Sequence, residues 1–222
     1  MIDISNVTVY GFEEAIRGMR NPKNSWNKMD SKFRIDGSMS DNKCNTLLGP
    51  NDMDLCMRLA RGGGVHAKYR RYITVYMDIN APLYFWKEFD TYRLGVAPNP
   101  GDIEMNSCST MHKIDDHEFT LDDFSCEHLK ECNVRLIKNI ITSLNANRNI
   151  FIASGKKDKD AWWQMIQLLP STYMQMRTVK INYEVLANMY QFRAGHKLDE
   201  WRALMLFCKN ELPCSQIFTL EV

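Results

Sequence analysis

The chain has 222 residues, of which 45% are hydrophobic and 25% are charged, a globular composition that excludes a disordered or fibrous protein. This length predicts one domain over residues 1–222, with a core large enough to need neither disulfides nor metal ions. Lysine and arginine total 28 against 27 acidic residues, so there is no basic field for a nucleic-acid polymer, and we expect no such partner.

Export and membrane signals are weak in this sequence. The opening segment has no apolar stretch behind a basic head, and no run reaches the roughly 20 apolar residues that span a bilayer. The 7 cysteines are odd in number and include no CxxC pair, which predicts reduced thiols. We therefore expect a cytoplasmic protein that does not associate with a membrane.

Two groups of candidate metal ligands have simpler structural interpretations. Cys126, His128 and Cys132 match no common zinc spacing and start a predicted amphipathic helix. The acidic stretch from Asp115 to Asp123 precedes the same helix, where negative charge stabilises a helix N-terminus. We predict no metal site.

The first half of the chain predicts an irregular excursion, a helix and a strand. Residues 21–51 are rich in Asn, Ser, Gly and Asp, which is typical of a surface excursion. Apolar residues at helical spacing predict a helix from Met53 that ends at the glycines 62–64. Apolar and polar residues alternate over 72–79, which predicts a half-buried strand.

A second helix is expected directly after this strand. Asn80 is expected to cap it and Pro82 to open it, because proline is tolerated in the first helical turn. The helix should run to about Tyr92 before Gly95 and the prolines that follow break it.

The second half of the chain predicts alternating helices and one extended segment. An apolar stripe predicts a helix over 126–145, and a further helix over 160–169 should end at Pro170. Residues 173–181 look extended. Asn182 should cap the next helix, which ends near Gly195, and a last helix is expected with an apolar face formed by Trp201, Leu204, Met205 and Cys208.

Two blocks of this pattern resemble the flavin-dependent thymidylate synthases. The first is HAKYRRYITVYMDINAPLYFWKEFDTYRLG followed by VAPNPGDIEMNSCSTMH, which is similar to the family's histidine, strand, Ala-Pro, helix and signature loop. The second is LLPSTYMQMRTVKINYEVLANMYQFRAGHKLDEW, which is similar to the family's Leu-Pro, extended segment, Asn-capped helix and later His and Gln-Trp.

The resemblance implies an α/β (α+β) fold, a β-sheet packed with helices, assembled as a homotetramer with active sites shared between subunits. It implies the reductive methylation of dUMP to dTMP in nucleotide biosynthesis, with FAD as cofactor and with NADPH and methylenetetrahydrofolate as co-substrates. No protein residue is thought to act as a covalent nucleophile in this family. The protein groups position flavin and nucleotide and stabilise anionic charge.

The resemblance also indicates candidate site residues. Arg193 matches an arginine that contacts the nucleotide, and Ser109 matches the signature serine near the pyrimidine, so both are catalytic and substrate-binding candidates. Each has a structural alternative, a surface salt bridge for Arg193 and a turn hydroxyl for Ser109. The positions that bind FAD in the family are held by His66, Arg93, Asn182 and His196, although Asn182 is favoured as a helix cap.

The sequence departs from the family pattern at several positions. Ser107 stands in place of a glutamate, and Met111 and Ile166 stand in place of two arginines directed at the nucleotide. These departures leave two alternatives open, namely a non-catalytic nucleotide- or flavin-binding homologue, or a related flavoenzyme that acts on a different pyrimidine nucleotide. The nearby cations that could compensate are Arg70, Arg71, Lys113 and Arg177.

Overall fold

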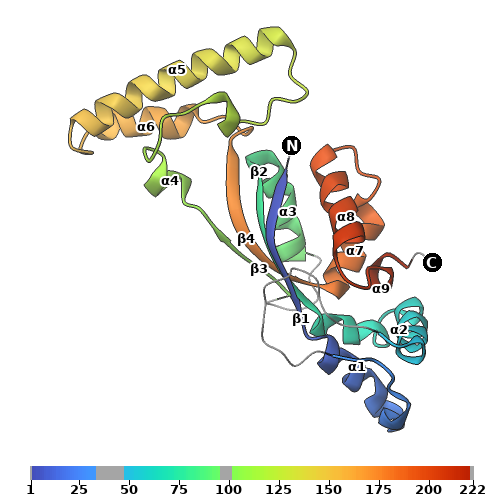
Figure 1. Cartoon of the computed structure of the whole chain (residues 1–222). Coiled ribbons are helices and arrows are strands. Elements are labelled where there is room, and N and C mark those ends of the chain that lie inside the picture. Colours follow the sequence, from blue (N-terminus) through green and yellow to red (C-terminus); the bar gives the residue numbers. More distant parts are fainter. Residues whose placement is uncertain (1, 34–47, 96–101, 221–222) are drawn as a thin grey trace. The chain divides into compact units, whose positions relative to one another are not determined.

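The computed structural model describes residues 2–33, 48–95 and 102–220 (Figure 1). Within these ranges the strands form one four-stranded sheet in the order β1-β2-β4-β3. The strands are β1 (Asp3–Tyr10), β2 (Thr74–Pro82), β3 (Ile103–Ser107) and β4 (Met174–Asn182). The longer helices are α1 (Phe12–Arg20), α2 (Pro50–Gly62), α3 (Leu83–Gly95), α5 (Glu131–Ala153), α6 (Lys159–Leu168), α7 (Tyr183–Arg193) and α8 (Asp199–Glu211). The short helical turns are η1 (Asn21–Lys23), η2 (Trp26–Lys28), η3 (Ala67–Tyr72), α4 (Thr110–Lys113), η4 (Leu121–Asp123) and α9 (Gln216–Thr219).

The two central strands, β2 and β4, run antiparallel. The amide of Tyr183, just after β4, donates to the carbonyl of Ile73, just before β2, at 3.0 Å. The amide of Leu83, just after β2, donates to the carbonyl of Tyr173, just before β4, also at 3.0 Å. The end of each strand therefore lies beside the start of the other, which requires opposite directions.

Helix α3 begins without the side-chain cap that the sequence suggested. Asn80 and Pro82 both belong to β2, so the prediction that they cap and open the helix is wrong. The amide of Leu83 finds its acceptor in the backbone carbonyl of Tyr173 instead. Because the neighbouring segment supplies acceptors for the first helical amides, the strand leads directly into the helix. The predicted helix itself is confirmed.

The chain divides into two compact units. Unit 1 contains Asn80–Glu88 and Ser107–Arg177, and unit 2 contains Ile2–Ile79, Phe89–Asn106 and Thr178–Val222. Single-domain organisation of the whole chain stays a prediction. None of the described helices is long and apolar enough to cross a membrane.

Unit 1 is organised by the long helix α5, which packs along α6 (Figure 1). Helix α5 buries Ile137, Leu144 and Phe151, whose spacing of seven residues keeps them on one face. The helix predicted over 126–145 therefore starts and ends later than expected. Residues before Glu131 form turns, and the apolar stripe continues to Phe151.

Unit 2 contains the helices that follow β4 and the helix α2. Trp201, Leu204, Met205 and Cys208 are all buried on one face of α8, which confirms the predicted apolar face. Burial raises the pKa of the Cys208 thiol to about 12, so this cysteine stays protonated at neutral pH. Helix α2 ends at Gly62, as the glycine run predicted.

The sequence did not predict β1 and α1. No residue of β1 is buried, and its apolar and polar residues alternate only over the short stretch Val7, Thr8 and Val9, a weak signal for a strand. Gly11 joins the two elements with φ +90°, and a Cβ there would come within 2.0 Å of the Tyr72 carbonyl oxygen. Only glycine fits this junction.

A buried carboxylate joins α1 to α2. Asp52 is fully buried and accepts hydrogen bonds from Arg20 Nε at 2.7 Å and Ser31 Oγ at 2.6 Å. Burial alone would raise the pKa of Asp52, but the hydrogen bonds from Ser31, the Asp30 amide and Arg20 hold it below its usual value. The predicted excursion over 21–51 includes residues 34–47, which lie outside the described residues.

Candidate functional site

Asn182 is the last residue of β4 and caps α7. Its Oδ1 accepts the amide hydrogen of Val185 at 3.0 Å, and its Nδ2 donates to Asp102 Oδ1 at 2.8 Å. The residue is only 4% exposed. Both ends of the amide are therefore used within the chain, which confirms the capping interpretation. A contact of Asn182 with FAD stays a prediction.

Arg193 ends α7 and lies against aromatic rings. Its guanidinium carbon is 5.3 Å from the ring centroid of Tyr92 and 5.3 Å from that of Trp201. Its Nε is buried and lacks a hydrogen-bond partner, and no described carboxylate forms an ion pair with it. The arginine is held by two rings instead of the surface salt bridge that was the alternative, and this leaves its charge uncompensated.

We call Tyr92, Trp201 and the Arg193 guanidinium that packs against both rings the aromatic cradle. Trp201 is 0% exposed and stacks on Phe89, with ring centroids 5.6 Å apart and an interplanar angle of 3°. Tyr92 is 3% exposed and packs on Trp201 at 5.5 Å. Since both rings are locked in the core of unit 2, they offer Arg193 a rigid surface.

His196 lies beside the same cradle. Its ring packs edge-on against Trp201 at 6.5 Å, and its Nδ1 accepts the amide hydrogen of Leu198 at 3.2 Å. Because Nδ1 acts as an acceptor here, the neutral ring carries its proton on Nε2. The turn between α7 and α8 therefore brings together two of the residues indicated by the sequence, His196 and Arg193.

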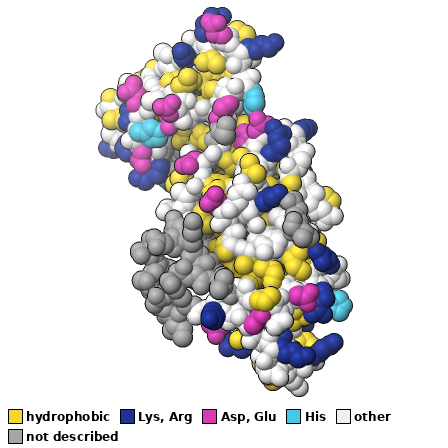
Figure 2. Space-filling model, turned by 45° about the vertical axis from the view of Figure 1, so that its right-hand side comes forward, with side chains coloured by type: hydrophobic (Ala, Val, Ile, Leu, Met, Phe, Trp, Pro, Cys, Tyr) yellow, Lys and Arg dark blue, Asp and Glu magenta, His cyan; other side chains and the backbone are white. Residues whose placement is uncertain are grey.

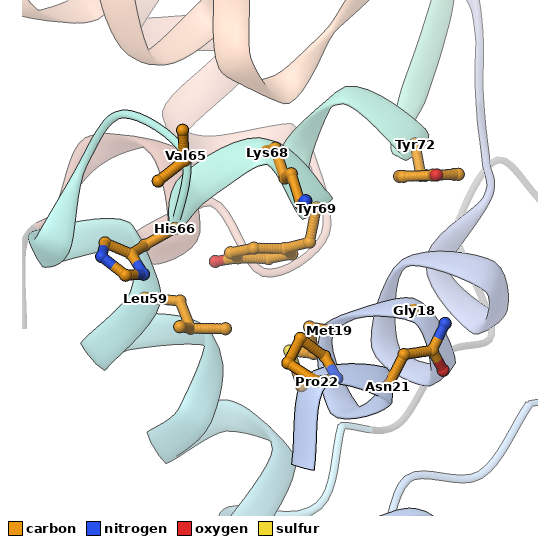
Figure 3. Close-up of a pocket in the computed structure, with 10 residues that line it drawn as sticks. All are labelled: Gly18, Met19, Asn21, Pro22, Leu59, Val65, His66, Lys68, Tyr69 and Tyr72. Atoms are coloured by element: carbon orange, nitrogen blue, oxygen red, sulfur yellow. The ribbon is translucent and has the colours of Figure 1, made fainter. Parts of the chain in front are cut away.

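His66 lies on a hollow of about 390 Å³ in unit 2 (Figure 3). In Figure 3, His66 and Leu59 are on one side, Gly18 and Asn21 are on the opposite side, and Tyr69 lies between them. Burial raises the pKa of Tyr69, whose hydroxyl donates to the Cys56 carbonyl at 2.8 Å, so the ring is a fixed wall. The lining residues are Gly18, Met19, Asn21, Pro22, Leu59, Val65, His66, Lys68, Tyr69 and Tyr72.

Ser109 belongs to unit 1 and caps the short helix α4. Its Oγ accepts the amide hydrogen of His112 at 3.1 Å and lies 2.9 Å from His112 Nδ1. The hydroxyl therefore has the local capping geometry that was the structural alternative. Its predicted position near a pyrimidine stays a prediction.

Three further positions bear on the predicted nucleotide site. Arg93 belongs to α3, but its side chain lies outside the described residues. Met111 is 55% exposed, and its carbonyl accepts the Trp162 Nε1 hydrogen at 3.2 Å. Ile166 packs against the core of unit 1. Neither Met111 nor Ile166 can supply a charge to a phosphate.

Two of the four cations that could replace the missing arginines already form ion pairs within the chain. Arg70 is buried and pairs with Glu184 at 2.7 Å, and Lys113 pairs with Asp116 at 3.2 Å. Arg71 differs, because its Nε is buried without a hydrogen-bond partner in the described part of the chain.

Arg177 is linked to the Ser109 segment within unit 1. Its guanidinium carbon lies 4.5 Å from the centroid of the Trp86 ring, and its Nε donates to Gln175 Oε1 at 3.0 Å. Gln175 Nε2 in turn donates to the carbonyl of Cys108, which precedes Ser109, at 2.8 Å. Two hydrogen bonds, through the Gln175 side chain, therefore connect Arg177 to the residue that precedes Ser109.

The face of the molecule in Figure 2 shows no basic field, and the described residues include no metal-ligand cluster. On the face in Figure 2, Lys and Arg side chains are interspersed with Asp and Glu, in keeping with the net charge of +1. Among the residues that the structure describes, no group of three or more His, Cys, Asp or Glu side chains is arranged to hold a metal ion.

Sequence reasoning missed the aromatic cradle. Trp201 was recognised as part of an apolar helix face and as the tryptophan of the family's Gln-Trp, and Tyr92 as the end of a helix within the family's Arg-His-Arg triplet, but neither was linked to Arg193. The two residues are far apart in the chain, so no local pattern could show that both contact Arg193.

The mixed helix and antiparallel-sheet fold is that of the flavin-dependent thymidylate synthases over the full length of the chain, which confirms the predicted fold class. The chain is similar to Thymidylate Synthase X (ThyX) from Helicobacter pylori, solved with FAD and dUMP, with a TM-score of 0.64 and 16% sequence identity over 100% of this chain and 98% of that chain. A second structure, flavin-dependent thymidylate synthase ThyX from Helicobacter pylori complexed with FAD and dUMP, gives a TM-score of 0.61 and 16% identity over 98% of both chains. No protein-family model and no curated protein matches the sequence.

Proposed function

We propose that this protein is a flavin-dependent thymidylate synthase-like enzyme that binds FAD and a pyrimidine nucleotide. The proposal rests chiefly on the full-length likeness to an enzyme solved with FAD and dUMP. The sequence resemblance assigns the nucleotide contact to Arg193, and Arg193 has an uncompensated charge at the end of α7.

The residues of unit 2 fit a diphosphate-bearing cofactor. His66 and Lys68 line the same hollow, where an imidazole and an ammonium group offer donors to phosphate oxygens. His196 and Arg193 lie together at the far end of α7. When bound and reduced by NADPH, FAD would supply the hydride for the reductive methylation, and methylenetetrahydrofolate would supply the carbon.

The protein groups act by holding anionic charge in place. A guanidinium presents two parallel N–H donors, so Arg193 can bind a phosphate or an anionic pyrimidine oxygen and fix its orientation. Asn182 caps α7 and so holds the helix that carries Arg193. Ser109 offers a hydroxyl that accepts one amide hydrogen and also forms a hydrogen bond with His112 Nδ1, so a nucleotide would have to compete with His112 for it.

We further propose that dUMP turnover is slow, or that a different pyrimidine nucleotide is the substrate. Met111 and Ile166 stand where the resemblance expects two arginines, and neither carries a charge. Losing two cationic contacts at about 1.5 to 3 kcal/mol each weakens phosphate binding by roughly two to four orders of magnitude. A contribution from Arg177 would reduce this loss.

A homotetramer is part of this proposal. Large apolar side chains on the outer surfaces of α5 and α6 are exposed, among them Leu136, Ile150 and Trp163. Exposed apolar area of this kind favours burial against another subunit. Light scattering at micromolar concentration should report a tetramer, and a monomeric mass would contradict a site shared between subunits.

The deciding experiment separates binding from turnover. Flavin fluorescence is titrated with the purified protein, and tritium release is then measured from labelled dUMP with methylenetetrahydrofolate, NADPH and FAD. Binding of FAD below about 100 μM, equivalent to more than about 5.5 kcal/mol, supports the cofactor assignment, and its failure overturns it. Turnover equal to an ordinary synthase would refute the slow-turnover proposal.

The second candidate is a homologue that binds nucleotide or flavin without catalysis. It is favoured by the loss of charge at Met111 and Ile166. Tight FAD and nucleotide binding with no tritium release from any uracil nucleotide would establish this candidate over the enzyme.

A further inference from the structure

Arg193, like Arg71, has no ion pair among the described residues, whereas the two buried arginines of unit 2 are each paired with a carboxylate. Arg20 pairs with Asp52 at 2.6 Å, and Arg70 pairs with Glu184 at 2.7 Å. The guanidinium of Arg193 has ring faces as its neighbours and no described counter-ion. Removing a charge from water without a counter-ion is unfavourable. The partly covered and unpaired guanidinium of Arg193 is therefore a group to which an anion from outside the described residues can bind.

The two ends of the Arg193 guanidinium have different surroundings. Nε is completely covered and has no hydrogen-bond partner, and the guanidinium carbon lies 5.3 Å from the centroids of both the Tyr92 and the Trp201 rings. The negative charge of a ring face stabilises such a contact. The residue as a whole is only half-buried, so the Nη end is the part that an oxyanion can reach.

The cradle also limits the rotamers of a long side chain. Arg193 is the last residue of α7, where no further helical turn packs against it. An arginine in that position samples many rotamers unless its surroundings select one. Tyr92 and Trp201 are themselves buried and rigid, so they can make that selection before a ligand arrives.

We propose that Tyr92 and Trp201 are positioning residues, whose ring faces hold the Arg193 guanidinium with its Nη atoms aimed at an oxyanion of the bound nucleotide. The identity of this ligand rests on the proposed function. The contacts of Arg193 with the two rings do not depend on which ligand binds. Neither ring touches the nucleotide in this proposal, and each acts only through Arg193.

The test is a double-mutant cycle on Tyr92 and Arg193. The four proteins are the unmodified chain, Tyr92→Met, Arg193→Ala and the double variant, and Tyr92→Phe is the matched control that keeps the ring. Each protein is measured by urea unfolding without ligand and by calorimetric titration with dUMP and, in parallel, with UMP and dCMP.

Tyr92→Met should weaken nucleotide binding by about three- to thirtyfold, whereas Tyr92→Phe should change it by less than about twofold. In the Arg193→Ala background, Tyr92→Met should have no further effect on affinity, because the ring acts only through the guanidinium. A general loss of packing would lower affinity equally in both backgrounds. That equal loss would overturn the proposal.

The unfolding measurements distinguish the cradle from the proposed function. If no nucleotide binds the unmodified protein, the proposed function fails. The free energies of unfolding of the four proteins then show whether positions 92 and 193 are energetically coupled, as the cradle requires. Absence of that coupling would refute the cradle. Should Tyr92→Met fail to fold, a tetrafluorinated phenylalanine at position 92 keeps the shape of the ring, removes the negative charge of its face, and is expected to reproduce the weaker binding.

Discussion

Replacement of Arg193 by alanine should separate ligand binding from folding. The guanidinium has no described ion pair, so its removal leaves no carboxylate unpaired in the described part of the chain. The contacts with Tyr92 and Trp201 are the main interactions that the folded variant would lack. Two cation–π contacts of this kind contribute about 0.5 to 2 kcal/mol together, and relief of the partly desolvated charge offsets part of that loss.

The effect on the nucleotide should be larger than the effect on folding. A charged hydrogen-bonded contact removed from a partly desolvated site costs about 2 to 4 kcal/mol, which corresponds to about 30- to 900-fold weaker binding. Arg193→Lys should also be impaired, because an ammonium group lacks the planar fork that both the rings and the oxyanion engage.

Calorimetric titration with dUMP, read beside the urea unfolding curve of each variant, measures both quantities. Arg58→Ala is the matched control, because Arg58 is an exposed arginine whose ion pair with Asp54 lies on the surface of α2. The control should leave affinity and stability nearly unchanged. Unchanged nucleotide affinity in a well-folded Arg193→Ala protein would refute the assignment of this residue to the nucleotide.

Three further predictions follow from local geometry. Asn182→Ala should lower the free energy of unfolding, measured by urea denaturation, by about 1 to 3 kcal/mol, because a helix cap and a buried hydrogen bond are lost together. A change below about 0.5 kcal/mol would contradict the capping role. Gly11→Ala should destabilise by at least about 2 kcal/mol on the same assay, because a Cβ would meet a backbone carbonyl at a positive φ, and a neutral effect would contradict this geometry. Burial raises the pKa of Cys56 and Cys208 to about 12, so both stay protonated at about pH 8 and should resist a thiol reagent until the protein unfolds, whereas exposed Cys108 should react in the native state. Labelling of either buried thiol as fast as that of Cys108 would contradict this burial.

Local sequence signals were sufficient to predict an element where a single capping side chain or a single apolar periodicity determines it. Asn182 caps the helix it was expected to cap, and the apolar face of α8 is buried as its spacing indicated. The strand before Ala81 was also recognised, because its alternation reflects one buried face. The resemblance carried the fold class as well, since the order of these elements is itself a sequence property.

Long-range contacts decided the features that the local signals missed. Asn80 looks like a cap, but the carbonyl of Tyr173 satisfies the Leu83 amide, so β2 continues through it. Strand β1 alternates only over Val7, Thr8 and Val9, which is too short to identify a strand without its neighbour β2. These cases share a cause, because the partner that determines the structure lies far away in the sequence.

The sequence by itself indicated most of the helices, because they depend on periodicity and residue order, and its resemblance to the flavin-dependent thymidylate synthases indicated the fold class and the candidate residues. Only the tertiary structure decided how those residues are used. It placed both His196 and Arg193 against the ring of Trp201, and it showed that the Asn182 side chain caps α7. It also packed Arg193 against Tyr92 as well as Trp201, with no ion pair to a described carboxylate. The physical reason is that charge compensation and side-chain orientation depend on neighbours in space, which no local pattern specifies.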